Sequence, residues 1–294
     1  MIIEKIKSLI SKFTIYKYMI SFLVVLHLVS VFFYGFSFKS LIPVLIAIIT
    51  TVTLDLSIEY FKSKKNQLEK NQIQNSIFFP HSGLISGLFI GGLLTQNLQW
   101  YIYVLAGIIA ILSKRLIKVQ QKHIFNPANL GILLVSIIFG ASHTWWISSP
   151  IILVLIFGIF IIWRLRRYDL TISFLATYFL INIIIQLFRR EQFLDFKYYY
   201  IIINGGVIYF FSMFMLIEPK TNPTARKQRI VYGILIALLF IIFQFYPQKF
   251  NNAVASFLVK HNLPLALAVG NIFVPILNRF KFEFKKKEEE IKKS

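Results

Sequence analysis

The chain has 294 residues, of which 57% are hydrophobic and only 15% are charged. A soluble globular domain carries about 25% charged residues, so this composition argues against a soluble protein and predicts an all-α integral membrane protein within the lipid bilayer. The net charge of +20 does not indicate nucleic-acid binding, because the basic residues lie in short loops between apolar runs. The sequence contains no Cys, so the chain cannot ligate an iron–sulfur cluster through thiolates.

Apolar runs near the length of a membrane span recur along the chain, since about 20 helical residues cross a hydrocarbon core of roughly 30 Å. We predict about ten transmembrane helices, at residues 18–36, 41–60, 77–95, 99–113, 129–146, 150–163, 169–188, 199–217, 230–246 and 262–278. Residues 1–17 are predicted to form an amphipathic cytoplasmic N-terminus. Residues 18–278 are predicted to form a single transmembrane domain, and residues 279–294 a basic cytoplasmic tail.

The distribution of Lys and Arg predicts the topology. With the N-terminus in the cytoplasm, 26 of the 32 basic residues lie on the cytoplasmic side and six on the other side. The positive-inside rule therefore favours an even number of spans in the cytoplasmic membrane, with both termini in the cytoplasm. Ten spans divide into two halves of five, and because five is odd the second half has the opposite orientation. This arrangement is an inverted repeat, which is common in transporters.

The third predicted span places Gly83, Gly87 and Gly91 four residues apart, on one helical face. Such a face allows close approach of another backbone, or of a flat ring or substrate. The corresponding span of the second half opens with Asn204, Gly205 and Gly206. Both are candidate ligand-binding segments, but for the glycine face we favour plain helix packing, with a ring or substrate lying against it as the alternative.

Polar residues introduce two other spans. Asn126 is a good N-cap before Pro127, and Asn129 adds an amide within the first turn. The free N–H groups of such a helix start favour an anion, although capping alone explains the pattern equally well. Glu218, at the predicted cytoplasmic end of the eighth span, is followed by a polar segment containing Thr221, Asn222 and Thr224.

Asp55 lies in the apolar second span. It is expected either to reach the membrane interface or to serve a proton or cation relay. No Walker loop, nucleophile elbow or dinucleotide-binding glycine motif is present, and no catalytic residue or metal ligand is assigned.

Several segments, in order, resemble the RnfD/NqrB-type family of membrane flavoproteins, which belong to Rnf electron transport complexes and to the sodium-translocating NADH:quinone reductase. They are His81-Ser-Gly-Leu-Ile-Ser-Gly87, Lys122-His-Ile-Phe-Asn-Pro-Ala-Asn-Leu-Gly131, 157–168 with 170–175, and Asn204-Gly-Gly206 through Met215-Leu-Ile-Glu-Pro-Lys-Thr-Asn-Pro-Thr224 to Tyr232-Gly233. Asn271–Arg279 resembles the family's closing helix. The resemblance covers roughly residues 80–280.

Two departures matter. Family members hold FMN through the last Thr of a Ser/Thr-Gly-Ala-Thr segment between the fifth and sixth spans. Here residues 140–150 contain no such motif, and Thr144 is the only Thr among them. The family's Asp-Pro is Glu218-Pro219. Covalent FMN is therefore not expected, whereas FMN, riboflavin or a quinone could bind noncovalently.

The resemblance implies a subunit of a redox-driven ion-translocating complex whose partners are other membrane subunits or a soluble flavin or iron–sulfur reductase. Without the covalent segment, three interpretations remain, in decreasing order of preference. The chain is an electron-transfer subunit with a noncovalent cofactor, a non-redox transporter or channel on the same scaffold, or a structural membrane subunit.

Overall fold

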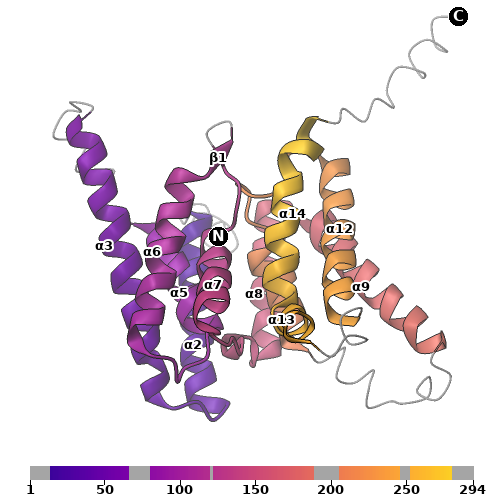
Figure 1. Ribbon diagram of the computed structural model, residues 1–294, viewed down its shortest axis with the longest axis horizontal. Coiled ribbons are helices and arrows are strands. Elements are labelled where there is room, and N and C mark those ends of the chain that lie inside the picture. Colours follow the sequence, from indigo (N-terminus) through magenta and orange to yellow (C-terminus); the bar gives the residue numbers. More distant parts are fainter. Residues whose placement is uncertain (1–13, 66–79, 120–121, 189–204, 246–251, 280–294) are drawn as a thin grey trace, which may run out of the picture.

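The computed structural model describes residues 14–65, 80–119, 122–188, 205–245 and 252–279. In these ranges the long elements are all helices, which stand side by side as a bundle (Figure 1). Two short strands, β1 (Lys118–Val119) and β2 (Lys122–His123), pair as an antiparallel hairpin. The predicted all-α membrane fold is confirmed.

The first half contains α2 (Ile15–Phe33), α3 (Leu41–Lys65), α5 (His81–Leu93), α6 (Trp100–Leu116) and α7 (Pro127–Phe139). The second half contains α8 (Ile151–Leu165), α9 (Tyr168–Phe188), α11 (Gly206–Phe210), α12 (Arg226–Phe245) and α14 (Asn262–Arg279). A π-helical turn, η4 (Phe211–Met215), extends α11, and α13 (Ala253–Lys260) precedes α14. Two 3-10 turns, η1 (Phe38–Ser40) and η2 (Trp146–Ser148), lie between helices.

Helix contacts show that the two halves repeat one arrangement. α2 packs on α5 as α8 packs on α11, α3 on α6 as α9 on α12, and α6 on α7 as α12 on α14. The first and last elements also meet their own counterparts, because α2 contacts α8 and α7 contacts α14. Counterparts run in opposite directions: α2 begins, and α8 ends, beside the same cavity. The predicted inverted five-helix repeats are therefore present.

Each predicted span has a helical counterpart, but several counterparts are short. Four helices are long and apolar enough to cross a membrane, and the pair of α13 and α14, bent by 83°, is a possible fifth span. α5 has 13 residues, which extend about 20 Å at 1.5 Å per residue and cannot cross a core of roughly 30 Å. The count of ten complete crossings therefore stays a prediction.

One end of the bundle carries most of the basic residues of the described loops and helix ends; we call it the basic end, at the top of Figure 1 near β1. Lys114 and Arg115 lie in the last turn of α6, and α12 starts with Arg226. Residues 1–13 and 280–294 lie outside the described residues, so most of the predicted N-terminus and tail is not placed. Ile15–Lys17 of the predicted N-terminus already belong to α2.

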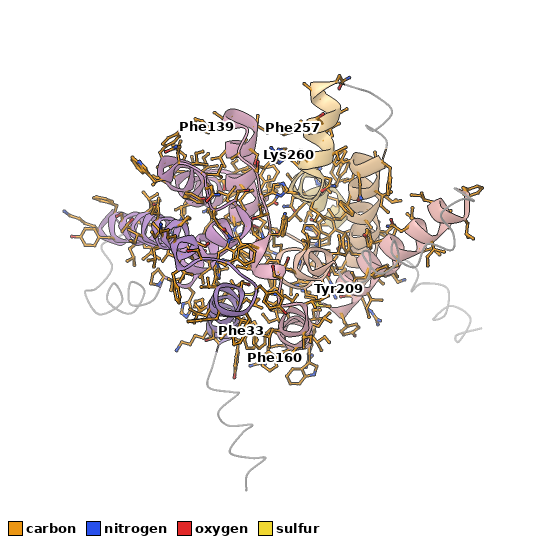
Figure 2. The ribbon with its side chains drawn as sticks, turned by 90° about the horizontal axis from the view of Figure 1, so that it is seen from below. Phe33, Phe139, Phe160, Tyr209, Phe257 and Lys260 are labelled. Carbon is orange, nitrogen blue, oxygen red and sulfur yellow. The ribbon has the colours of Figure 1, made fainter. Side chains whose placement is uncertain are left out.

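The surface of the bundle suits lipid. Phe33 and Phe139 are exposed by 79% and 44%, and in the view from the other end (Figure 2) the labelled Phe33, Phe139 and Phe160 lie along the perimeter. Aromatic residues buried inside, including Trp146, Phe174 and Tyr232, form part of the core. Apolar side chains therefore face both the lipid and the core, as expected for a helix bundle in a membrane.

Candidate functional site

A cavity of about 460 Å³ opens at the basic end, between the first half and the segment that follows η4. Its apolar wall includes Met19 of α2, Ile85 and Phe89 of α5, and Phe214 of η4. Its polar wall consists of charged or hydrogen-bonding side chains from several elements: Asp55, Glu59, Ser82, Lys114, Arg115, His123, Asn126 and Glu218. The volume falls in the range of small-molecule sites, about 300–1,000 Å³.

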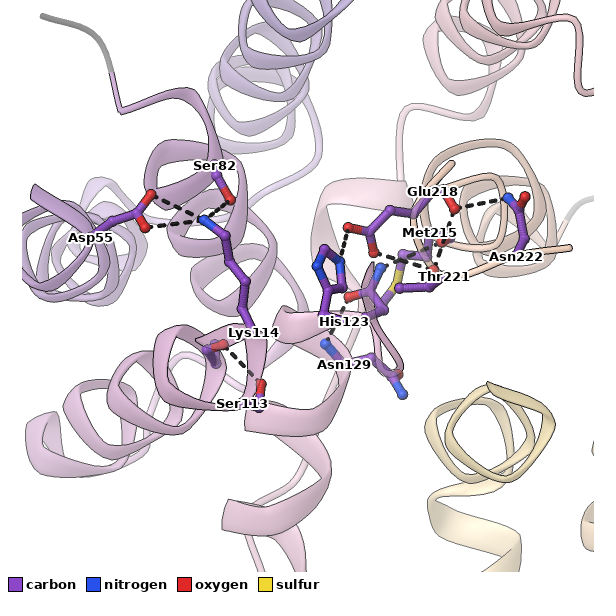
Figure 3. Close-up of polar contacts among 12 residues, drawn as sticks. Asp55, Ser82, Ser113, Lys114, His123, Asn129, Met215, Glu218, Thr221 and Asn222 are labelled. Carbon is purple, nitrogen blue, oxygen red and sulfur yellow. Dashed lines mark hydrogen bonds and ion pairs between the residues drawn. The ribbon is translucent and has the colours of Figure 1, made fainter. Parts of the chain in front are cut away.

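Four of these residues form an ion-pair cluster, defined as Asp55, Glu59, Lys114 and Arg115. The Lys114 ammonium lies 3.0 Å from Asp55 Oδ1 and donates to the Ser82 hydroxyl at 2.7 Å, linking α6 to α3 and α5 (Figure 3). Arg115 contacts Asp55 Oδ1 at 2.7 Å and Glu59 Oε1 at 2.5 Å. The Asp55 side chain is only 7% exposed. Buried charges require such partners, because desolvation of an unpaired charge is costly.

The opposite polar side of the cavity joins the two halves. His123 Nε2 lies 3.0 Å from Glu218 Oε1, so β2 of the first half contacts the segment after η4 of the second (Figure 3). Asn222 donates through Nδ2 to the Glu218 carbonyl at 2.8 Å, and the Thr221 backbone N–H donates to the same oxygen at 3.2 Å. These bonds fold residues 218–222 into a turn that fixes the position of the carboxylate.

The start of α7 is held by amide side chains. The Asn126 carbonyl Oδ1 accepts from the Asn129 backbone N–H at 3.1 Å, which satisfies one of the free N–H groups of the helix end. Asn126 Nδ2 donates to the Met215 carbonyl at 3.4 Å, and Asn129 Nδ2 donates to Pro264 O at 2.9 Å. Asn271 of α14 can accept from the Asn126 backbone N–H at 3.2 Å. Elements of both halves therefore meet at this helix start.

We expect Asn126→Ala to destabilise the folded protein by about 1–2 kcal/mol, because it removes both the N-cap and the bond to Met215. Asn126→Ser is the informative partner variant. Its neutral hydroxyl still caps the helix by accepting from the Asn129 N–H but is too short to donate to Met215, so about half of the loss should be recovered. Chemical unfolding in detergent measures both values. Equal losses for Ala and Ser would show that the cap contributes nothing.

A match to a protein family shows to which group of proteins the chain is related. A model of the NQR2, RnfD, RnfE family matches residues 7–151 and 148–283. These two segments meet where the contact pattern divides the bundle into halves. The chain belongs to the NQR2, RnfD, RnfE family. It is therefore a multi-pass membrane subunit of the Rnf/Nqr type, as the resemblance predicted. A comparison with curated proteins finds no match.

In this family member, the residues predicted as one site are distributed over several places. Asn126 and Glu218 line the cavity. Thr221 and Asn222 hydrogen-bond to Glu218: the Thr221 hydroxyl donates to the carboxylate, and Asn222 Nδ2 donates to the backbone carbonyl. Thr224 lies farther along the chain, where its backbone N–H donates to Asn278 Oδ1 at 3.1 Å and not to a group of the cavity wall.

The other predicted residues lie away from the cavity. Asn129 points to Pro264. Gly205 caps α11, and a Cβ on Gly206 would lie 2.2 Å from the Ser148 carbonyl oxygen, so this glycine serves close packing. Asn204 lies outside the described residues.

The glycine face of α5 is occupied by α3, which corrects the idea that a ring lies against it. A Cβ on Gly87 would lie 2.6 Å from Ile48 Cα, and one on Gly91 would lie 2.4 Å from Val44 Cα. Gly83 similarly faces the backbone of Thr51. Close helix packing, the interpretation favoured from the sequence, describes this face. A ligand of the cavity would instead meet Ile85 and Phe89, which lie on another side of α5.

Sequence reasoning did not assign Lys114, Arg115 or His123 to the site. Two features of the sequence indicated that Lys114 and Arg115 could belong to the site. Asp55 and Glu59 are four residues apart, so they share one face of α3. The predicted topology already placed Lys114 and Arg115 at the same membrane side as the end of α3. Neither signal shows that α3 and α6 are neighbours, and this adjacency is what creates the cluster.

Proposed function

We propose that the chain is an electron-transfer membrane subunit whose basic-end cavity binds a flavin, or a quinone, noncovalently. The cavity between Phe89 and Phe214 on one side and the ion-pair cluster on the other carries this proposal. A flat ring system has an apolar face and a polar edge, and the cavity offers both kinds of surface. We place it in a redox-driven ion-translocating complex with other membrane subunits, or with a soluble flavin or iron–sulfur reductase.

The polar wall contains cations that suit the edge of such a ring. Lys114 and Arg115 line the cavity while they contact Asp55 and Glu59. Their ammonium and guanidinium groups are hydrogen-bond donors without acceptor capacity. A carbonyl oxygen of an isoalloxazine or quinone ring would accept from them at the cavity surface.

The charges of the cavity also favour a ligand with little net charge. The carboxylates of Asp55 and Glu59 contact Lys114 and Arg115, and Glu218 contacts His123. The positive charges of the ion-pair cluster are thus already balanced by carboxylates. When bound, the flavin or quinone would accept and donate electrons. Lys114 and Arg115 would orient its polar edge, and Phe89 and Phe214 would exclude water from its face.

Family members carry covalent FMN on the segment between the fifth and sixth spans. In this chain the corresponding segment, residues 140–150, packs against the rest of the bundle. The Thr144 backbone N–H donates to the Leu93 carbonyl at 2.9 Å, and Trp146 is buried and donates through Nε1 to the Gly91 carbonyl at 3.0 Å. This arrangement supports our proposal that any flavin is held noncovalently.

The full chain purified in mild detergent should show the visible absorbance of an oxidised flavin, and denaturation with acid should release the flavin from the polypeptide. Ile85→Trp, which fills the cavity, should lower flavin per folded protein at least tenfold. Ile49→Trp is the matched control, because Ile49 is 62% exposed on the bundle surface, and it should retain the flavin. A quinone would be recognised by solvent extraction of the same samples.

The inverted repeat supports a second candidate, a transporter or channel without redox chemistry. Short helices that end inside a bundle form solute sites in transporters, and α5 and α11 with η4 have this character. Protein that carries neither flavin nor quinone but moves a small solute into liposomes would replace the redox proposal with this one.

We further propose that the basic end faces the cytoplasm, as the positive-inside rule requires. Cysteine introduced at Lys64 of α3 and at Lys220 should react with a membrane-impermeant reagent only after the cytoplasmic side is exposed. Cysteine introduced at Lys39, near the opposite end, should react from outside the intact cell. Reaction of the Lys64 position from outside the intact cell would contradict this orientation.

A further inference from the structure

A second group of basic residues lies at the basic end, outside the lining of the cavity. Arg164 lies in the last turn of α8, Arg166 and Arg167 lie in the turn between α8 and α9, and α12 begins nearby with Arg226. The Arg226 guanidinium lies 5.7 Å from the centre of the Tyr168 ring, which joins α12 to this turn. We call these four residues the arginine patch: Arg164, Arg166, Arg167 and Arg226.

The carboxylate nearest to the patch is already bound. Asp169, which is 6% exposed, contacts Arg229 through Nε at 2.8 Å and Nη2 at 2.7 Å. Among the described residues, no acidic side chain contacts the four patch guanidiniums. Burial, followed by the nearby Arg229, lowers the pKa of Arg167, whereas Asp169 raises it, so Arg167 and Arg229 share the field of one carboxylate. The first turns of α9 and α12 add the positive ends of two helix dipoles.

The backbone at Arg166 is unusual. Its φ of 54° and ψ of 46° place it in the left-handed region after the end of α8, where Gly is the common residue. An Arg at this position is less favourable for folding than a Gly would be. The conformation exposes the Arg166 side chain at the turn.

An apolar stripe on α8 leads directly to the patch. Ile152, Ile156, Ile159 and Trp163 are exposed by 68%, 56%, 60% and 65%, and their spacing of four, three and four residues aligns them on one helical face. In a membrane protein this face contacts lipid chains, and an exposed Trp is typical of the headgroup level. A molecule at Arg164 would therefore meet charge and hydrocarbon surface together.

We propose that the arginine patch binds the phosphate of an anionic phospholipid, whose acyl chain lies along the α8 stripe. Guanidinium groups bind phosphate oxygens through two parallel hydrogen bonds. The stripe distinguishes a lipid from free phosphate, which would gain nothing from Ile156 or Ile159. None of the four arginines lines the cavity, although Leu165 beside them does, and lipid binding here does not require the proposed cofactor.

The test uses the full chain in detergent, titrated with phosphatidylglycerol or cardiolipin, with phosphatidylcholine, and with inorganic phosphate. Retained lipid is counted by native mass spectrometry, and affinity is taken from the shift of the thermal unfolding midpoint. Anionic lipid should bind and stabilise the protein. Arg164→Gln/Arg226→Gln should weaken this binding about 30-fold, since each basic residue near a membrane surface contributes roughly fivefold. Lys62→Gln/Lys64→Gln removes the same charge elsewhere on the basic end and should leave affinity unchanged.

Arg166→Gly provides a variant that should fold well. Gly relieves the left-handed backbone, so the protein in phosphatidylcholine should unfold at an equal or higher temperature, while affinity for phosphatidylglycerol falls. These opposite changes separate a lipid contact from a structural role. The proposal is wrong if Arg166→Gly leaves anionic-lipid affinity intact or the two lysine changes weaken it equally. Equal stabilisation by inorganic phosphate would likewise show a soluble-anion site and overturn the lipid assignment.

Discussion

Asp55→Asn is expected to destabilise the folded protein by roughly 3–5 kcal/mol, because removing one partner of a buried ion pair leaves the other charge uncompensated. Two cations depend on this carboxylate, Lys114 at 3.0 Å and Arg115 at 2.7 Å. Asp55 and Lys114 side chains are only 7% and 12% exposed, so water replaces little of the lost interaction. The unfolding free energy in detergent, or the folded fraction after expression, measures the effect.

Glu59→Gln is the matched control for this prediction. Glu59 also contacts Arg115, but its side chain is 35% exposed, and ion pairs that reach solvent contribute about 0–1 kcal/mol. Asp55→Asn/Lys114→Met should recover part of the stability, since it removes the stranded ammonium with the carboxylate. If Asp55→Asn and Glu59→Gln unfold alike, the cluster does not hold α3 and α6 together.

The sequence allowed the helical segments to be predicted because each span is a local apolar run. It also allowed the halves to be assigned, because charge asymmetry depends on the number of crossings and not on contacts. Helix ends were less well predicted: the third span was expected from residue 77, whereas α5 starts at His81 and ends at Leu93. Leu94, directly after α5, instead forms a β-bridge with His143, which follows α7 near the end of the first half of the sequence. No local pattern encodes that pairing.

The candidate site was predicted only in part, for the same reason. Asn126 and Glu218 were recognisable as polar residues next to helix ends, and both line the cavity. Asp55 was recognised as an unusual intramembrane charge, but its partners are 59 and 60 positions away. The glycine stripe shows the opposite problem. Its spacing correctly indicates close approach, yet spacing cannot tell whether a ring or a neighbouring helix fills the space.

Gly91→Ala is expected to destabilise the protein by about 1–3 kcal/mol, the cost of adding volume to a packed interior. The new methyl group would lie 2.4 Å from Val44 Cα, which is backbone and cannot rotate away. α3 and α5 would have to separate at Gly91 and Val44, neither of which lines the cavity. Thermal or chemical unfolding of the purified protein measures the loss.

Gly107→Ala is the control, because it makes the same substitution within a helix of the same half. Its Cβ would lie 3.1 Å from a methyl group of Thr50, the end of a side chain. Ala also favours a helix over Gly by about 0.5–1 kcal/mol, so the net change should be close to zero. The comparison further separates the two interpretations of the glycine stripe. A packing face predicts that Gly91→Ala lowers stability and that the remaining folded protein keeps its ligand. If stability were unchanged and bound flavin were lost, the ring would lie against the glycine face of α5 after all, and the position of α3 would need revision.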